Sequence, residues 1–87
     1  MLAEEIQLLV EENIVDSTVL VSSEDEVHFH ITVVSEQFNN MKLLQRQRMV
    51  YASLSSHISS GELHSVIIKA YTNIEWNNSQ GKLEGNE

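Results

Sequence analysis

Apolar residues recur along the chain with two different periods, and these periods predict its secondary structure. Near the N-terminus they fall three or four residues apart, which is typical of the buried face of a helix, and we expect that helix over residues 2–13. Apolar and polar residues alternate over 15–22 and again over 27–35. This period of two predicts two strands, joined as a hairpin by the polar loop 23–26.

A second helical stripe follows, and it predicts a helix from about 43 to 59 that Gly61 ends as a C-terminal cap. The stripe consists of Leu43, Leu44, Gln47, Val50, Tyr51, Leu54 and Ile58. A run of β-branched and aromatic residues then predicts a third strand over 64–72, followed by a short helical turn around 73–77.

The predicted elements follow the order α-β-β-α-β-α, which indicates an α+β fold. Helices on one face of a three-stranded sheet would make a two-layer sandwich. The second and third strands are joined across the long helix, and a crossover of this length favours a parallel pair in a mixed sheet. We expect one domain over residues 1–77 and a polar, disordered tail over 78–87.

Composition excludes several kinds of chemistry. The 87 residues include no cysteine, so the chain offers no disulfide, no thiol nucleophile and no cysteine metal ligand. The N-terminal residues are acidic at once, unlike a signal peptide, and no apolar stretch is long enough to span a bilayer. Since no catalytic motif stands out either, we expect a cytoplasmic protein that is not an enzyme and does not bind membranes.

Charge is distributed unevenly along the chain. The net charge of −8 argues against sequence-independent binding of nucleic acid, because phosphates would be repelled. No Asp or Glu occurs from Gln37 to Gly61, however, and Lys42, Arg46 and Arg48 lie in that segment. The sequence therefore allows a local basic patch, which is either a solvated helix face or a docking surface.

Several short motifs occur in the order and spacing of one known family. They are the Val-Val-Ser-x-x-Phe run within 32–38, the Gln-Arg-x-x-x-Val-Tyr run within 44–51, the segment 60–64 and the segment 69–72. On these motifs the chain resembles the BolA family over residues 1–77. It departs from the family in the turn after Phe38, where Asn39-Asn40 stands in place of a glycine, and in a hairpin loop that is acidic and lacks glycine.

The resemblance implies a class II KH-like fold and a partnership with a monothiol glutaredoxin. It further implies a 2Fe–2S cluster that bridges the two proteins, with glutathione supplying one thiolate, in iron–sulfur cluster trafficking or iron sensing. The ligands that the resemblance assigns to this chain are His64, at the start of the third strand, and His28, from the hairpin. On residue pattern alone, a histidine placed like His64 at the entry of a strand is more often structural than a metal ligand. His30 could replace His28, and His28 with His30 could chelate Zn or Cu.

The candidate partner surface comprises Lys42, Arg46, Arg48, Lys69 and Tyr71. A rival interpretation is a KH-like, nucleic-acid-binding transcriptional regulator. True KH domains clamp the nucleic-acid backbone with a Gly-x-x-Gly loop, whereas Gly61 stands alone here. His57 falls near the apolar stripe of the long helix, and we expect it to be packed or half-exposed. The sequence does not decide whether the chain forms a homodimer.

Overall fold

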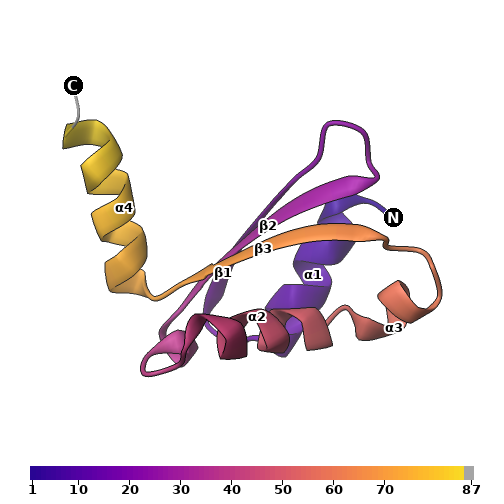
Figure 1. The fold of residues 1–87 in the computed structure, drawn as a ribbon, viewed down its shortest axis with the longest axis horizontal. Helices are drawn as coiled ribbons and strands as arrows, with labels where there is room; N and C mark the ends of the chain where they lie inside the picture. The colour runs from indigo at the N-terminus through magenta and orange to yellow at the C-terminus, as the bar shows by residue number, and fades with distance from the viewer. Residues whose placement is uncertain (86–87) are drawn as a thin grey trace.

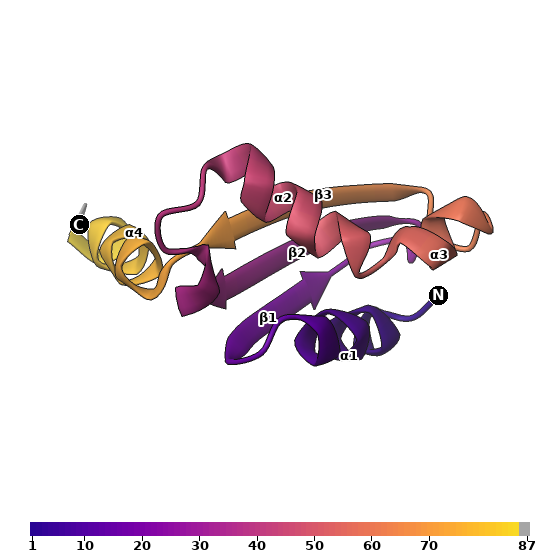
Figure 2. The same ribbon diagram turned by 90° about the horizontal axis from the view of Figure 1, so that it is seen from below.

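The computed structural model describes residues 1–85, which form a three-stranded sheet and four α-helices (Figure 1). In chain order these are α1 (Ala3–Asn13), β1 (Ser17–Ser22), β2 (His28–Ser35), α2 (Leu43–Ala52), α3 (Ser55–Ser59), β3 (Ser65–Tyr71) and α4 (Asn73–Gly85). A 3-10 turn, η1 (Glu36–Phe38), follows β2. Helices α1 and α2 cover the same face of the sheet, as Figure 2 shows from below. The predicted two-layer α+β sandwich is confirmed.

The sheet has the order β1-β2-β3, with β2 in the centre. β1 runs antiparallel to β2, with Ser22 opposite His30, and β3 runs parallel to β2, with Ser65 opposite His28. The predicted mixed sheet and its parallel pair are therefore confirmed. Because side chains alternate across a strand, β2 sends Phe29 and every second residue after it toward the helices.

The core lies between this inner sheet face and the two helices. Its fully buried members come from every layer: Ile6, Val10, Ile14, Val19, Phe29, Ile31, Val33, Phe38, Val50, Leu54 and Leu63. Each large side chain of this kind stabilises the fold by about 2 kcal/mol relative to an exposed position. Within the described residues, no helix is both long and apolar enough to cross a membrane.

The long helix predicted over 43–59 is interrupted, and this prediction was wrong in detail. α2 ends at Ala52 and α3 begins at Ser55, with Leu54 between them at φ −114° and ψ 3°. At the break, the carbonyl of Val50 accepts hydrogen bonds from both the backbone amide and the hydroxyl of Ser53. The change of direction places Leu54 in the core, where it is fully buried.

The strands begin later than their apolar patterns indicated. Val15 and Val27 begin the two predicted strands, but both lie outside the observed ones and are 63% and 49% exposed. Asp16 directly follows Val15, and Glu26 directly precedes Val27. Both residues lie in tight turns and adopt left-handed φ angles, of 56° and 61° respectively. Asn40, in the turn where the family usually has glycine, has φ 65°, which asparagine tolerates better than most residues.

α4 is longer than the short turn that we expected around 73–77, because it continues to Gly85. It begins where Thr72 and Glu75 exchange hydrogen bonds, with the Glu75 amide donating to the Thr72 hydroxyl and the Thr72 amide to the Glu75 carboxylate. The disorder predicted for 78–87 stays a prediction, and residues 86–87 lie outside the described residues.

Candidate functional site

The hairpin loop between β1 and β2 is organised around one carboxylate, that of Asp25. Its Oδ1 accepts the backbone amides of Val27 and His28 at 3.0 and 2.9 Å. Its Oδ2 lies 2.7 Å from Nδ1 of the His28 ring. The His28 amide, then the His28 ring and the Val27 amide, hold the pKa of Asp25 well below its ordinary value. Asp25 is therefore an anion that fixes both the loop backbone and the imidazole.

This contact determines which atom of His28 can bind a metal. An anionic carboxylate accepts a hydrogen bond from Nδ1–H, so the neutral ring carries its lone pair on Nε2. The side chain of His28 is 66% exposed, and it lies on the outer face of the sheet, opposite the helices. A histidine held by a carboxylate through its other nitrogen is the usual arrangement of metal-binding histidines. Sequence analysis missed Asp25, for which the only signal was an aspartate three residues before a histidine.

His64 is carried by the loop that joins α3 to β3. Gly61 turns the chain there with φ +86°, and the Cε1 atom of His64 lies 3.9 Å from where a Cβ at Gly61 would stand. Two residues before His64, the Glu62 carboxylate lies 2.9 Å from Nδ1 of His57. The amide of Leu63, whose side chain is fully buried, donates to the carbonyl of His57. The backbone next to His64 is thus anchored on both sides, while His64 itself is exposed.

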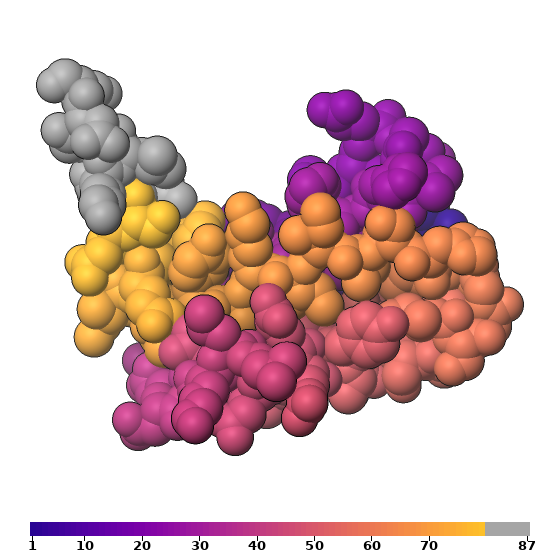
Figure 3. Space-filling view, in the orientation of Figure 1, coloured from indigo at the N-terminus to yellow at the C-terminus, as the bar shows by residue number. Residues whose placement is uncertain are grey.

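The register of β2 and β3 brings the two candidate ligands to the same end of the sheet. His28 is the partner of Ser65, the residue directly after His64. In Figure 1 and Figure 3 this end, on the right, carries the hairpin loop and the α3–β3 loop. His30 lies on the same outer face as His28 but two residue pairs further along the strands, opposite Ile67. Along the strands, the register places His28 closer than His30 to the residue that follows His64.

A hollow of about 460 Å³ lies in the hairpin loop, and both His28 and His30 line it. Its other walls are acidic or hydroxylic, namely Ser22, Ser23, Glu24 and Asp25. Among the described residues, no group of three or more His, Asp or Glu side chains is arranged to hold a metal ion. His28 and His64 could offer at most two nitrogen ligands, so a four-ligand centre here would need its other two from elsewhere.

Arg46 does not belong to a solvent-exposed basic surface, which corrects its assignment as a partner-binding residue. It is only 6% exposed. Its guanidinium donates to the carbonyls of Met41 and Ala70 at 2.9 and 3.2 Å, and to the two carboxylate oxygens of Glu75 at 2.6 and 3.3 Å. These bonds to Arg46, with a further one from the Thr72 amide, lower the pKa of Glu75. Arg46 instead ties α2 to β3 and to the first turn of α4.

The other candidate partner residues are accessible, but they do not gather around the two histidines. Lys42, Arg48 and Lys69 are exposed, and Tyr71 is half-buried with its ring 5.4 Å from that of Trp76. Tyr71 ends β3, six residues after Ser65, which places it about 20 Å along the sheet from the ligand end. With Arg46 buried, the predicted basic patch is reduced to Lys42, which precedes α2, and Arg48 on α2.

His57 is half-exposed, with 27% of its side chain accessible, which agrees with its expected placement. Its contact with Glu62, and hence its role beside His64, was not foreseen. The hydrogen bond from His57 lowers the pKa of Glu62. The two residues are five positions apart in a polar segment, and no pattern in the sequence pairs them.

Comparison of the sequence with known proteins identifies one protein family that matches most of this chain. The family model described as BolA-like protein matches residues 9–75. The acid stress protein IbaG of Escherichia coli K12 is 40% identical over 63 residues, covering 72% of this chain and 74% of IbaG. BolA-like protein 1 of Bos taurus is 41% identical over 51 residues, which are 59% of this chain but 37% of the bovine protein.

Solved structures agree with the sequence matches. A bolA protein homologue from Coxiella burnetii superimposes with a TM-score of 0.78 at 30% identity, over 88% of this chain and 97% of that one. The solution structure of BolA1 from Mus musculus gives a TM-score of 0.77 at 28% identity, over 90% of this chain and 70% of the mouse chain. The sequence comparison and the structure comparison therefore identify proteins of the same family.

Proposed function

Because this chain belongs to the BolA-like protein family, we propose that it is a cytoplasmic adaptor that binds a monothiol glutaredoxin and shares a bridging 2Fe–2S cluster with it. In this proposal His64 and His28 are the two ligands from this chain. The partner's cysteine and glutathione supply the two thiolates, and the complex acts in iron–sulfur cluster trafficking or iron sensing.

The observation that carries the proposal is the placement of the two histidines. Both are exposed at one end of the parallel β2–β3 pair, and His28 is the strand partner of the residue after His64. Asp25 keeps the proton of His28 on Nδ1, which leaves Nε2 as the donor atom. The fixed backbone around Gly61 limits the conformational entropy that His64 would lose when it binds iron.

The donor set fits a shared cluster. The chain has no cysteine, so it can give nitrogen ligands but no thiolate. Two imidazoles on one iron in place of two thiolates raise the reduction potential of a 2Fe–2S centre. Acidification should weaken sharing, because a protonated imidazole has no lone pair for iron.

The test is to mix the protein with a cluster-bearing, glutathione-loaded monothiol glutaredoxin and to follow visible, circular dichroism and electron paramagnetic resonance spectra. We expect a Rieske-like change with the wild type and its loss with His64→Ala. His28→Ala should retain part of the change, because the loop histidine must be ordered on binding. His30→Ala is the matched control, a histidine on the same strand face that is expected to leave the spectra unchanged.

Two outcomes would count against the assignment. A wild-type spectrum from the His64→Ala mixture would show that this ligand set is wrong. If His30→Ala abolished the spectral change and His28→Ala did not, the ligand from the hairpin would be His30 rather than His28. The proposed adaptor function would not be affected.

A further inference from the structure

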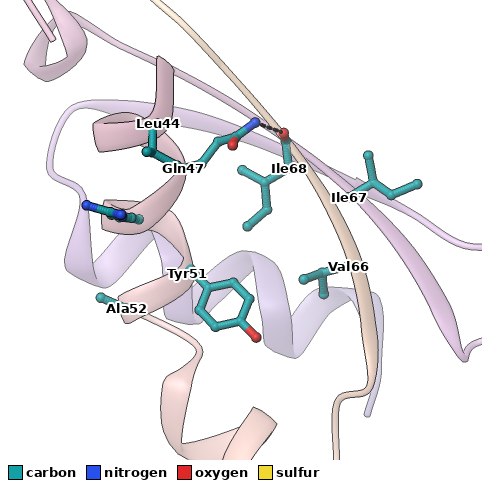
Figure 4. A pocket seen from close by; sticks show the side chains of 8 residues that line it. Leu44, Gln47, Tyr51, Ala52, Val66, Ile67 and Ile68 are labelled. Carbon is teal, nitrogen blue, oxygen red and sulfur yellow. Dashed lines mark hydrogen bonds between the residues drawn. The ribbon is translucent and has the colours of Figure 1, made fainter. Parts of the chain in front are cut away.

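A groove that the ligand proposal does not use lies between α2 and β3 (Figure 4). It has a volume of about 620 Å³, and its walls are mainly apolar. Leu44 and Tyr51 face it from the helix, and Ile67 flanks it from the strand; these three side chains are 57%, 45% and 51% exposed. Apolar side chains that remain this accessible along one continuous groove are characteristic of a binding surface.

The strand that borders the groove is an edge strand. β3 is last in the order β1-β2-β3, so its outer backbone groups have no strand partner. The Ile68 carbonyl points outward and accepts a hydrogen bond from the Gln47 side chain at 3.3 Å (Figure 4). The next outward carbonyl, that of Ala70, is bonded by Arg46. Since outward groups recur at every second residue, Val66 presents its amide and carbonyl to the same edge.

The two ends of the groove therefore differ. At Ala70, the buried side chain of Arg46 already bonds the outward carbonyl, so no further strand can pair with β3 at this residue. At Ile68 the only cover is one exposed glutamine side chain, which a competing donor can displace. At Val66 the groove is lined by Tyr51 and Ala52 of the helix. A segment of extended chain could pair with β3 from Val66 to Ile68 but no further.

Charge favours an acidic occupant. The chain carries a net charge of −8, yet the segment from Gln37 to Gly61, which includes all of α2, contains no Asp or Glu. Arg48 lines the groove and makes no ion pair with any described carboxylate. This is a cationic and apolar strip on an otherwise acidic protein.

We propose that this groove binds an extended peptide segment of another protein, whose groove-facing side chains are apolar, acidic and apolar in turn, as a fourth strand beside β3. Its main chain would bond the outward groups of Val66 and Ile68 in place of Gln47. Its apolar side chains would contact Leu44 and Tyr51, and a carboxylate would pair with Arg48. Adding a strand to an exposed sheet edge is a recurrent mode of peptide recognition.

Two other occupants fit less well. A second copy of this chain, packed symmetrically through β3, would bring two Arg48 side chains and two chains of charge −8 together. A nucleic acid strand needs several cations along its phosphates, and the groove offers only one among apolar walls. Both remain distinguishable by experiment.

The test uses the full chain without any cluster, so it is independent of the ligand proposal. The probe is a capped peptide of about six residues, Val-Thr-Glu-Thr-Val-Thr, in which Val, Glu and Val share one face, titrated to millimolar concentration while amide resonances are followed by NMR. We expect the amides of Val66 and Ile68 to shift and to exchange more slowly. Two N-methylated versions block alternate amides, and only the one whose β3-facing amides are blocked should fail to bind.

Variants in the groove sharpen the result. Arg48→Gln should weaken the peptide about two- to fivefold, as expected for an exposed ion pair, and Lys42→Gln, an exposed cation outside the groove, should not. Gln47→Ala should strengthen binding, because it removes the competitor for the Ile68 carbonyl. Absence of binding, equal binding of both N-methylated peptides, or shifts confined to another face would overturn the proposal. So would a single-stranded oligonucleotide that shifts the same amides and displaces the peptide, or concentration-dependent dimerisation that shifts them without peptide.

Discussion

Replacement of Arg46 tests whether a buried cation helps to hold the end of the fold together. Arg46→Ala removes the hydrogen bonds from the guanidinium to the carbonyls of Met41 and Ala70 and to the Glu75 carboxylate. Because the Ala70 carbonyl is left in a buried place, its desolvation alone costs about 1–3 kcal/mol. Glu75 is 46% exposed and can be solvated by water instead, so losing its ion pair with Arg46 should cost closer to about 1 kcal/mol.

Together these losses should lower the free energy of unfolding by about 3 kcal/mol. For a domain of this size that corresponds to a fall in Tm of roughly 12–24 °C. Arg46→Lys keeps the charge but cannot make the same fork of bonds, so it should lose about half as much. The assay is urea and thermal unfolding followed by far-ultraviolet circular dichroism.

Arg48→Ala is the matched control, since Arg48 is an exposed arginine on the same helix and should cost less than about 0.5 kcal/mol. If Arg46→Ala were no more destabilising than Arg48→Ala, the structural role assigned to Arg46 would be refuted. A cost that vanishes in a Glu75→Ala background would instead show that the ion pair carries the whole effect and the carbonyl contacts none.

Two further predictions concern the acidic residues. Since the pKa of Glu75 is lowered in the folded protein, its ionised form contributes stability above its ordinary value of 4.5, and that contribution is lost as pH falls below 4.5 through the folded pKa. The difference in Tm between wild type and Glu75→Gln should therefore shrink on acidification, and a difference that grows would contradict this sign. Asp25→Ala should accelerate hydrogen exchange of the Val27 and His28 amides while leaving Tm nearly unchanged, because the loop is exposed; unaltered exchange would remove Asp25 as the organiser of the hairpin.

The order of elements and the mixed sheet could be predicted because both depend on local periodicity and on one topological rule. The face of α2 could not. Counting apolar residues placed Leu43, Leu44 and Tyr51 toward the core, whereas all three are exposed and Arg46 is buried in their stead. Arg46 can be buried there because the Ala70 carbonyl and the Glu75 carboxylate, 24 and 29 residues away, meet its guanidinium, and periodicity carries no information about such partners.

The candidate ligands were identified from motif resemblance, and the structure adds what surrounds them. Register relates His28 to the residue after His64, but that register is fixed by the whole β2–β3 pairing rather than by residues near either histidine. The support given by Asp25 is local and could have been suspected from its spacing to His28. The Glu62–His57 contact depends on how α3 ends. The break between α2 and α3 could not be predicted, because the sequence has no glycine or proline at that point.

The central position of β2 has a consequence for how the chain folds. β2 meets β1 through a short hairpin loop, whereas its pairing with β3 must close the whole segment from Glu36 to His64. Contacts between distant residues form late because the entropy of closing their loop has to be offset first. We therefore expect the β1–β2 hairpin to precede docking of β3, with the edge of β2 transiently exposed and prone to intermolecular pairing. The chain contains no proline, so no slow isomerisation phase should obscure this step in refolding experiments.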